Sequence, residues 1–194
     1  MIILDTQHNK KNPDIIILVL DAVRARNLSC YGYERKTSPY IDEFAKKNAI
    51  YENAISTSSW TLPSVSSIFT GLFPSEHGIL GMNTKLTKQD TIANKLKSYG
   101  YETIAFSNVG WVTKYLGLNK GFDTFYEYDK YNLPKQKLAK YIELLKSTLS
   151  LRDYGAELAN KQIMHWFQNR KKNKPYFMYV HYVEPHFPYN PPRP

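Results

Sequence analysis

The sequence predicts an α/β fold in which helices cover both faces of a mainly parallel, doubly wound sheet. Apolar runs at 15–20 and 175–183, rich in β-branched or aromatic residues, are typical of strands buried on both faces. Segments with apolar residues at helical spacing separate these runs. In such sheets ligands bind beyond the carboxyl ends of the strands, so residues that directly follow a strand are the first candidates for a site.

The amino-terminal half is expected to alternate strands and helices. Its predicted elements, in order, are a strand at 14–20, a helix beginning at Ser38-Pro39, a short strand at 49–55 and a helix beginning near Thr61. Both helices are marked by a hydroxyl residue shortly before a proline. This pattern is typical of a helix start, because proline is tolerated in the first turn.

The carboxyl-terminal half continues the alternation. Its predicted elements are a helix at 87–99 ended by Gly100, a strand at 101–106, a loop at 107–132, helices at 134–149 and 153–170, and a strand at 175–183. The proline-rich segment 184–194 cannot pair as a strand, because proline has no backbone N–H to donate.

The composition indicates one globular domain without disulfides. The 194 residues suffice for one core, and the single cysteine, Cys30, cannot form an internal disulfide. The longest apolar run is too short to span a bilayer and the start of the chain does not resemble a signal peptide, so a cytoplasmic location is expected. The net charge of +9 comes from dispersed lysines, without a nucleic-acid-binding signature. We therefore expect solvated faces and no nucleic-acid partner.

Two residues stand where chemistry is expected. Asp21 ends the first buried strand, where a carboxylate is unfavourable unless it caps a helix at 22–28 or binds a metal ion. Thr61 lies at the predicted start of a helix, either as a plain cap or as a reactive hydroxyl. The positive end of the helix dipole and its unpaired N–H groups would suit an anionic ester there.

Three short motifs follow Thr61 in order: Pro63-Ser64, Thr70-Gly71 and His77-Gly78. Together with Thr61 they resemble the nucleophile segment of the sulfatase family, within the alkaline-phosphatase superfamily. Two positions depart from the family pattern. Thr61 replaces the Cys or Ser that sulfatases oxidise to formylglycine, and Val65 replaces an Arg. An unmodified Thr is similar to the nucleophile of phosphoethanolamine and glycerol-phosphate transferases.

Further segments resemble the same family in the same order. Asp21, followed by Leu28-Ser29-Cys30-Tyr31-Gly32, resembles its opening metal motif, in which Ala22 replaces a second Asp. The run 175–192 resembles the strand and the loop that carry the active-site histidine, here His186. Gly121-Phe122-Asp123 is similar to a structural turn of the family. His77 and His181 are expected to be structural.

The resemblance implies an alkaline-phosphatase-like fold and a chemical role for each site residue. Thr61 would be the covalent nucleophile, and it would share one divalent metal ion (Mn, Zn, Mg or Ca) with Asp21. His186 would contact the ester and protonate the leaving group. Lys114 and Asn108 fall where the family usually binds substrate. The expected activity is that of a hydrolase or transferase acting on sulfate or phosphate esters.

The resemblance also predicts a chain that is truncated at its carboxyl terminus. Residues 1–194 would form the amino-terminal portion of a single catalytic domain, with 1–12 flexible and the later Asp-His-Gly metal-ligand segment absent. Such a chain would expose a sheet edge and could self-associate. Two alternatives remain open: a non-catalytic anion-binding protein of the same family, and a relative of the phosphoethanolamine or glycerol-phosphate transferases.

Overall fold

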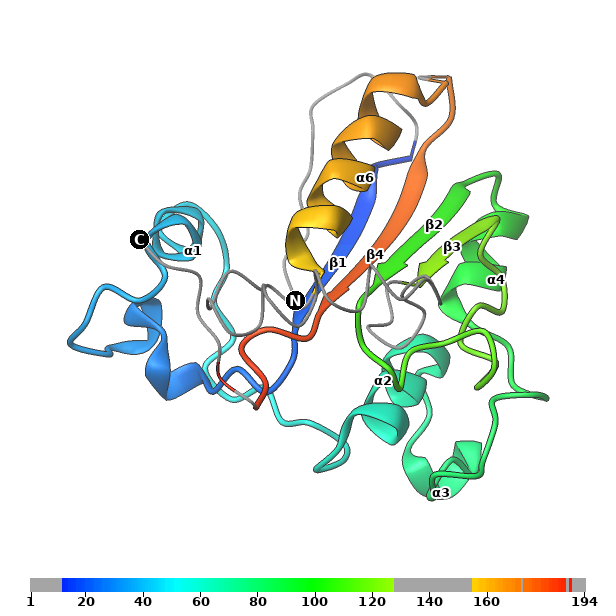
Figure 1. The fold of residues 1–194 in the computed structure, drawn as a ribbon, viewed down its shortest axis with the longest axis horizontal. Helices are drawn as coiled ribbons and strands as arrows, with labels where there is room; N and C mark the ends of the chain where they lie inside the picture. Colours follow the sequence, from blue (N-terminus) through cyan, green and yellow to red (C-terminus); the bar gives the residue numbers. More distant parts are fainter. Residues whose placement is uncertain (1–11, 128–154, 172, 188, 190–194) are drawn as a thin grey trace, which may run out of the picture.

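Four parallel strands form the single sheet of the described structure, a computed structural model that describes residues 12–127, 155–171, 173–187 and 189 (Figure 1). The strands are β1 (Ile15–Leu20), β2 (Glu102–Ser107), β3 (Thr124–Glu127) and β4 (Tyr176–Tyr182). They lie in the order β1-β4-β2-β3, and each neighbouring pair is parallel. The α/β class is confirmed. The predicted helix at 134–149 and the predicted flexibility at the start of the chain concern residues outside the described ranges.

The register brings the carboxyl ends of three strands to one edge of the sheet. Leu20 of β1 pairs with Tyr182 of β4, and Ser107 of β2 pairs with His181. The residues that follow β1, β2 and β4 therefore meet at this edge, where ligands are expected in a parallel sheet. β1 and β3 are the outer strands of the described sheet. Self-association through a sheet edge stays a prediction.

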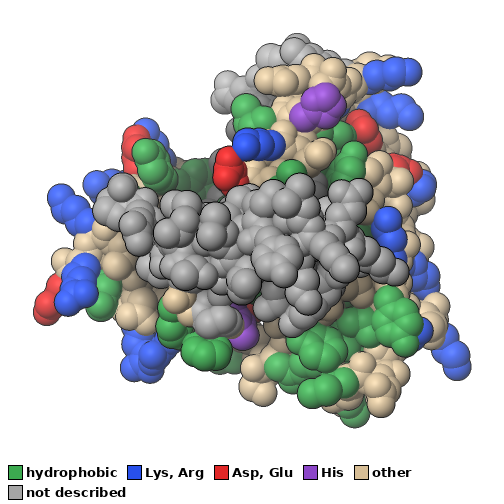
Figure 2. Space-filling model, in the orientation of Figure 1, with side chains coloured by type: hydrophobic (Ala, Val, Ile, Leu, Met, Phe, Trp, Pro, Cys, Tyr) green, Lys and Arg blue, Asp and Glu red, His purple; other side chains and the backbone are tan. Residues whose placement is uncertain are grey.

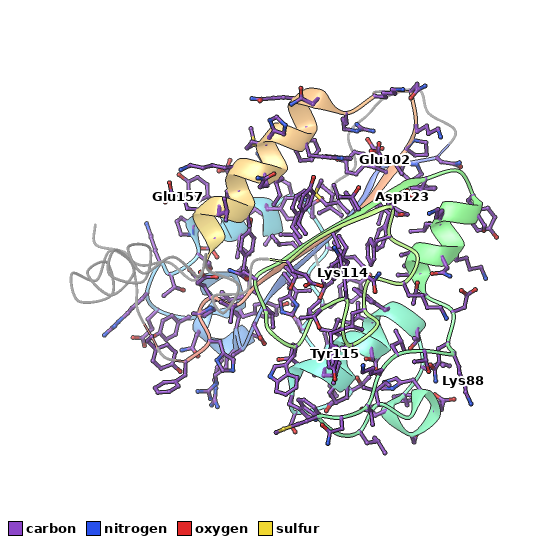
Figure 3. All side chains as sticks on the ribbon, turned by 45° about the vertical axis from the view of Figure 1, so that its right-hand side comes forward. Lys88, Glu102, Lys114, Tyr115, Asp123 and Glu157 are labelled. Atoms are coloured by element: carbon purple, nitrogen blue, oxygen red, sulfur yellow. The ribbon has the colours of Figure 1, made fainter. Side chains whose placement is uncertain are left out.

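Helices cover both faces of the sheet. The helical elements are η1 (Ala25–Asn27), η2 (Ser29–Tyr31), α1 (Pro39–Ala45), α2 (Thr61–Thr70), α3 (Pro74–His77), α4 (Ile92–Ser98) and α6 (Ala156–Asn169). Figure 3 views the sheet nearly edge-on, with α6 on one side and α2 and α4 on the other. Within the described ranges, no helix combines the length and the apolar character needed to cross a membrane. The cytoplasmic location stays a prediction.

The larger core lies between α2 and the sheet. Leu62, Val65 and Phe69 of α2 are almost completely buried, and Phe69 packs edge-on against Tyr179 of β4 with ring centroids 4.7 Å apart. Each such side chain contributes about 1.5–3 kcal/mol through its removal from water. This packing fixes the start of α2 against the sheet, and with it the position of Thr61.

A second core lies on the opposite face. Trp166 and Phe167 of α6 pack edge-on against Tyr176 at centroid distances of 5.2 and 5.7 Å. Met178 and Val180 of β4 are buried in the same cluster. β4 is therefore covered on both faces, as its continuous apolar sequence predicts.

Three predicted elements differ from the structure. The short strand at 49–55 is wrong: the segment is irregular, and Tyr51 and Ile55 are 74% and 90% exposed, so no core holds them as a strand. β3 lies where the sequence predicts a loop, because its four residues form no apolar run. The helix predicted at 87–99 begins at Ile92, because Thr91 caps it by accepting a hydrogen bond of 3.2 Å from the Asn94 backbone N–H.

The turn before β3 is confirmed as structural. Gly121 has a φ of +87°, and a Cβ built there would lie 2.3 Å from the backbone N of Asn94. Asp123 accepts a 3.0 Å hydrogen bond from the Thr103 backbone N–H and forms a 2.5 Å ion pair with Lys97. Partial burial acts to raise the pKa of Asp123, but the hydrogen bonds from Lys97 and Thr103 outweigh it and lower that pKa.

Candidate active site

A cleft of about 620 Å³ lies at the carboxyl edge of the sheet, beside the start of α2. Its described lining includes residues that follow β1, β2 and β4, together with a group of hydroxyl side chains: Ser56, Ser58, Ser59, Thr61 and Ser64. Asp21, Asn108 and His186 also line it, so four of the five predicted site residues, Thr61 included, meet in one cavity.

Asp21 and Thr61 are in direct contact in this cleft. The Thr61 hydroxyl donates a hydrogen bond of 3.2 Å to Oδ2 of Asp21. The sequence predicts that these oxygens lie within about 4 Å of each other, and the distance agrees. The alternative role of Asp21 as a helix cap is wrong, because Arg24 is the N-cap of η1 and Asp21 belongs to neither 3-10 helix.

The backbone turns sharply directly after Asp21. The backbone N–H of Asp21 still bonds to the carbonyl of Tyr182 at 2.9 Å, as a continuation of the sheet. Ala22 then adopts a φ of +59°, a conformation that costs a residue with a side chain roughly 1 kcal/mol. The parallel ladder and this turn together hold Asp21 in the lining of the cleft.

Thr61 is the first residue of α2, as the sequence predicts. The N-cap is Trp60, whose backbone is extended and whose side chain makes no capping hydrogen bond. The alternative role of Thr61 as a plain N-cap is therefore wrong. The positive end of the α2 dipole and its first N–H groups face the cleft without a side-chain cap from Trp60.

His186 lies in the turn that leaves β4. Its backbone N–H bonds to the Val183 carbonyl at 2.7 Å, and its Nδ1 lies 2.6 Å from the carbonyl oxygen of Phe187. Because a carbonyl can only accept, Nδ1 carries a proton and donates it in this bond. Nε2 is then the ring nitrogen that remains for chemistry in the cleft.

Asn108 lines the cleft, but its side chain holds the loop that carries His186. Its Oδ1 accepts from the Val183 backbone N–H at 2.7 Å, and its Nδ2 donates to Oε2 of Glu184 at 3.0 Å. The amide is thus engaged on both sides. The structure places Asn108 as a support for the site, while substrate contact by this residue stays a prediction.

Lys114 is not brought to the cleft. Its side chain is exposed, it is not among the described residues that line the cavity, and its backbone N–H bonds to the Glu127 carboxylate (Figure 3). The position predicted from the resemblance therefore does not place this ammonium group beside Thr61.

The described lining of the cleft contains no lysine or arginine. Val65, in the position where the resemblance expects an arginine, is 2% exposed and packs in the core. On the face shown in Figure 2, lysine and arginine side chains are scattered along the outline and do not form a single patch. An anion in this cleft would therefore meet hydroxyl groups, the start of α2 and any bound cation.

Tyr179 and His181 form a buried pair that the sequence does not predict. Both side chains are fully or almost fully buried, and the Tyr179 hydroxyl lies 2.8 Å from Nδ1 of His181. Burial lowers the pKa of His181 to about 3, so the ring is neutral, and burial with the nearby Asp21 charge raises that of Tyr179. Strand alternation could have revealed the pair, because 177, 179 and 181 share a face.

The expectation that His77 is structural is confirmed. Its Nδ1 accepts a 3.0 Å hydrogen bond from the Ile79 backbone N–H, and its Nε2 lies 3.1 Å from the Ser67 hydroxyl. Its carbonyl accepts from the Gln89 side chain at 2.7 Å. His77 therefore ties the turn after α3 to α2, away from the cleft.

The oxygens of Asp21 and Thr61 fit part of a divalent metal site. A cation with bonds of about 2.0–2.6 Å could contact both, because they lie 3.2 Å apart. The described residues contain no group of three or more His, Cys, Asp or Glu that could hold a metal ion. This pair would therefore supply two ligands and not a complete coordination shell.

The fold is shared with a protein of the alkaline-phosphatase superfamily. A superfamily protein from Vibrio parahaemolyticus superposes with a TM-score of 0.61 at 20% identity, over 96% of this chain and 44% of that one. The family profile described as Sulfatase matches residues 13–194. The chain therefore belongs to the sulfatase family, as the motifs around Thr61 and His186 indicate.

Two of the similar proteins are named as sulfatases. An N-acetylgalactosamine-6-O-sulfatase of Bacteroides thetaiotaomicron is 34% identical over 51% of this chain and 20% of its own length. An N-acetylglucosamine-6-O-sulfatase of the same organism is 24% identical over 91% of this chain and 31% of its own length. The chain thus spans between a fifth and a third of the length of these two relatives.

Solved structures share the fold. The phosphonate monoester hydrolase of Agrobacterium radiobacter superposes with a TM-score of 0.72 at 18% identity, covering 94% of this chain and 43% of that one. A protein solved with its substrate D-glucosamine-2-N,6-O-disulfate also gives 0.72, at 23% identity, covering 91% and 35%. At these identities the likeness concerns the fold.

Proposed function

We propose that this protein is a metal-dependent hydrolase of sulfate or phosphate esters that uses Thr61 as a covalent nucleophile. The observation that carries this proposal is the 3.2 Å contact between the Thr61 hydroxyl and the Asp21 carboxylate at the start of α2. A free Thr hydroxyl is a weak nucleophile, and a nearby carboxylate and metal ion are the usual means of activation. Membership of the sulfatase family supports the same reaction class.

The reaction would proceed in two displacements. Thr61 Oγ1 passes its proton to the Asp21 carboxylate and bonds to the sulfur or phosphorus atom, while the bond to the ester oxygen breaks and protonated His186 gives its Nε2 proton to the departing alcohol. Water then bonds to the sulfur or phosphorus atom and breaks its bond to Thr61; one water proton returns to His186, Asp21 returns its proton to Thr61, and sulfate or phosphate leaves with the other water proton, which it releases to solvent. A divalent cation held by Asp21 and Thr61 would supply a lowered pKa for the Thr61 hydroxyl and charge balance for the ester oxygens.

Charge in the described cleft favours a singly charged ester. Asp21 is the only carboxylate in the described lining, and no lysine or arginine accompanies it. One carboxylate and one divalent cation leave a single positive charge, which matches a sulfate ester better than the dianion of a phosphate monoester. The characterised relatives named above act on sulfated sugars by their names, which supports this choice.

Two aromatic side chains favour a substrate with a ring. Trp60 and Trp111 both line the cleft and meet edge-on, with ring centroids 5.4 Å apart. Such a wall offers apolar contact to a sugar or aryl group while the hydroxyl side chains meet the charged end. We therefore propose a sulfated sugar or an aryl sulfate as the substrate class.

Trapping the covalent intermediate tests the proposal. The protein in its natural length, loaded with Mn²⁺ or Ca²⁺, is incubated with 4-nitrophenyl sulfate or 4-nitrophenyl phosphate, quenched in acid and digested. We expect the mass of one sulfuryl or phosphoryl group on the peptide that contains Thr61, and no formylglycine at that position. Chelator-treated protein is the control. Turnover with an unmodified Thr61 peptide, under conditions where the second step is slow, would contradict the proposal.

Two alternatives give different products. A transferase related to the phosphoethanolamine and glycerol-phosphate enzymes would pass the group from Thr61 to an alcohol, so added glycerol would appear as glycerol phosphate. A non-catalytic anion-binding protein would bind inorganic sulfate and release no nitrophenol. Product analysis with and without glycerol separates these alternatives from hydrolysis.

A further inference from the structure

His181 is buried in the site with one ring nitrogen unused. The residue is 2% exposed, and its Nε2 is buried without a hydrogen-bond partner among the described residues. The other nitrogen, Nδ1, is paired with the Tyr179 hydroxyl at 2.8 Å. Buried polar groups in folded proteins nearly always have a partner, so an unpaired one calls for a ligand or a bound water.

The position of His181 points to the cleft as the source of that partner. His181 lines the same cavity as Asp21 and Thr61. Side chains alternate between the two faces of a strand. Ile17 and Val19 of β1 and Phe177 and Tyr179 of β4 belong to the core on the face covered by α2. Asp21 and His181 are the next residues on that same face, at the edge of the sheet.

The partner of Nδ1 decides which nitrogen carries the proton. If the Tyr179 hydroxyl donates to Nδ1, both of these groups are satisfied and only Nε2–H remains to be paired. If instead Nδ1–H donates to Tyr179, the hydroxyl proton and the Nε2 lone pair both lack partners in a fully buried pocket. The first arrangement leaves fewer buried polar groups unpaired, so Nε2 is a hydrogen-bond donor.

We propose that Nε2–H of His181 binds an oxygen of the sulfuryl or phosphoryl group at Thr61, with Tyr179 as the positioning residue that fixes its tautomer. This inference rests on the proposed function of the cleft. It assigns His181 a direct substrate contact, in place of the structural role that the sequence predicts.

A neutral donor suits a cleft without arginine or lysine in its described lining. It can donate to an oxygen that gains negative charge as the bond to Thr61 forms, which is the role of a donor in an oxyanion hole. Since burial keeps the ring uncharged, His181 donates a hydrogen bond and transfers no proton. Proton transfer to the leaving group is left to His186.

Two substitutions distinguish the effect of losing the Nε2–H donor from the effect of losing the imidazole ring. His181→Leu removes the Nε2 donor, and His181→Gln restores an N–H at a similar distance from the backbone. We expect His181→Leu to lower kcat/KM for 4-nitrophenyl sulfate and to raise the inhibition constant of inorganic sulfate, each by about 10²-fold. His181→Gln should recover most of that loss. The shape of the pH profile should stay unchanged in both, because no proton transfer is removed.

His165→Leu is the matched control, since His165 is exposed on α6 and its substitution should change neither value. Loss of activity by His181→Gln equal to that of His181→Leu, with native circular dichroism, would count against a hydrogen-bonding role. A shifted pH limb in His181→Gln would assign proton transfer to this residue and overturn the proposal.

A spectroscopic measurement gives an answer that does not depend on turnover. With ¹⁵N-labelled histidine, the His181 ring should be the neutral Nε2–H form down to about pH 5, and Tyr179→Phe should shift the tautomer balance. Saturating inorganic sulfate should move the Nε2 resonance of the metal-loaded protein. Turnover with an unmoved Nε2 would overturn this inference and leave the proposed function intact. A shift of the Nε2 resonance without turnover would support the His181 contact and contradict the proposed hydrolase function. If neither a shift nor turnover is seen, both proposals are wrong.

Discussion

The hydroxyl of Thr61 lies 3.2 Å from Oδ2 of Asp21, although 40 residues separate them in the sequence. One comes from the end of β1 and the other from the first turn of α2, two elements held by the same core. The contact gives the hydroxyl proton an acceptor and places two oxygens where one cation could bind both. The first two predictions follow from this pair.

Thr61→Ala should reduce kcat for an aryl sulfate by at least about 10³-fold, because the covalent nucleophile is lost. Thr61→Ser should retain part of the activity, since it keeps the hydroxyl. Ser64→Ala is the control within the same cleft: the Ser64 hydroxyl pairs with Ser56 at 2.9 Å and not with Asp21. Steady-state kinetics decide the matter, and equal losses from Thr61→Ala and Ser64→Ala would remove Thr61 from the mechanism.

Asp21→Asn should weaken binding of Mn²⁺ or Ca²⁺ by more than about tenfold, because a charged ligand is replaced by a neutral one of the same shape. Asp90→Asn, at an exposed position, should leave metal affinity unchanged. Calorimetry on protein stripped with a chelator gives both affinities. Unaltered binding by the Asp21 variant would place the cation elsewhere.

Gly121→Ala should destabilise the fold by several kcal/mol, because a Cβ there would lie 2.1 Å from Oδ1 and 2.3 Å from the backbone N of Asn94. Gly100→Ala is a close control, since its φ of +85° is nearly the same but nothing lies within 4 Å of the added Cβ. Gly100→Ala should lower the free energy of unfolding by about 1 kcal/mol, which is the cost of a left-handed backbone conformation for a residue with a side chain. Urea unfolding measures the stability of both variants. Equal losses of stability would mean that the turn at Gly121 moves to accommodate the Cβ without strain, which would contradict the prediction.

Asp123→Asn should destabilise the protein at neutral pH, and the difference from wild type should shrink in acid. The hydrogen bonds from Lys97 and Thr103 lower the Asp123 pKa below its ordinary value of 3.8, against the effect of burial. The stabilisation is therefore complete above about pH 4–5 and is lost as pH falls through the lowered pKa. Urea unfolding from pH 7 to pH 3 checks the trend; a constant difference across this range would contradict it.

Much of the fold could be predicted because its central strand is continuously apolar. The sequence of 175–183 predicts burial on both faces, and β4 lies between β1 and β2 with helices on either side. β3 could not be predicted in the same way, because a four-residue outer strand gains its pairing from β2 and needs little apolar sequence of its own. The strand predicted at 49–55 is wrong because the apolar residues of this segment are exposed and it forms no strand.

The site was predictable where it follows strand ends and helix starts. Asp21 and Thr61 stand at such positions, so their proximity could be predicted from the sequence. Lys114 was placed by resemblance alone, and the loop after β2 carries it to an exposed position instead. The role of His181 depends on a tertiary hydrogen-bond pattern, and a histidine inside an apolar run carries no sign of that pattern.

The order of strands has a consequence for how the chain is made. β4 occupies an inner position in the sheet, yet Phe177 pairs with Ile15, which leaves the ribosome 162 residues earlier. Until β4 emerges, β1 and β2 have no shared neighbour, and the ladder that positions Asp21 cannot form. β2 can pair with β3 as soon as β3 is made, but the nascent chain must keep the apolar strand β1 unpaired until β4 emerges, and this interval is when we expect a chaperone to be needed.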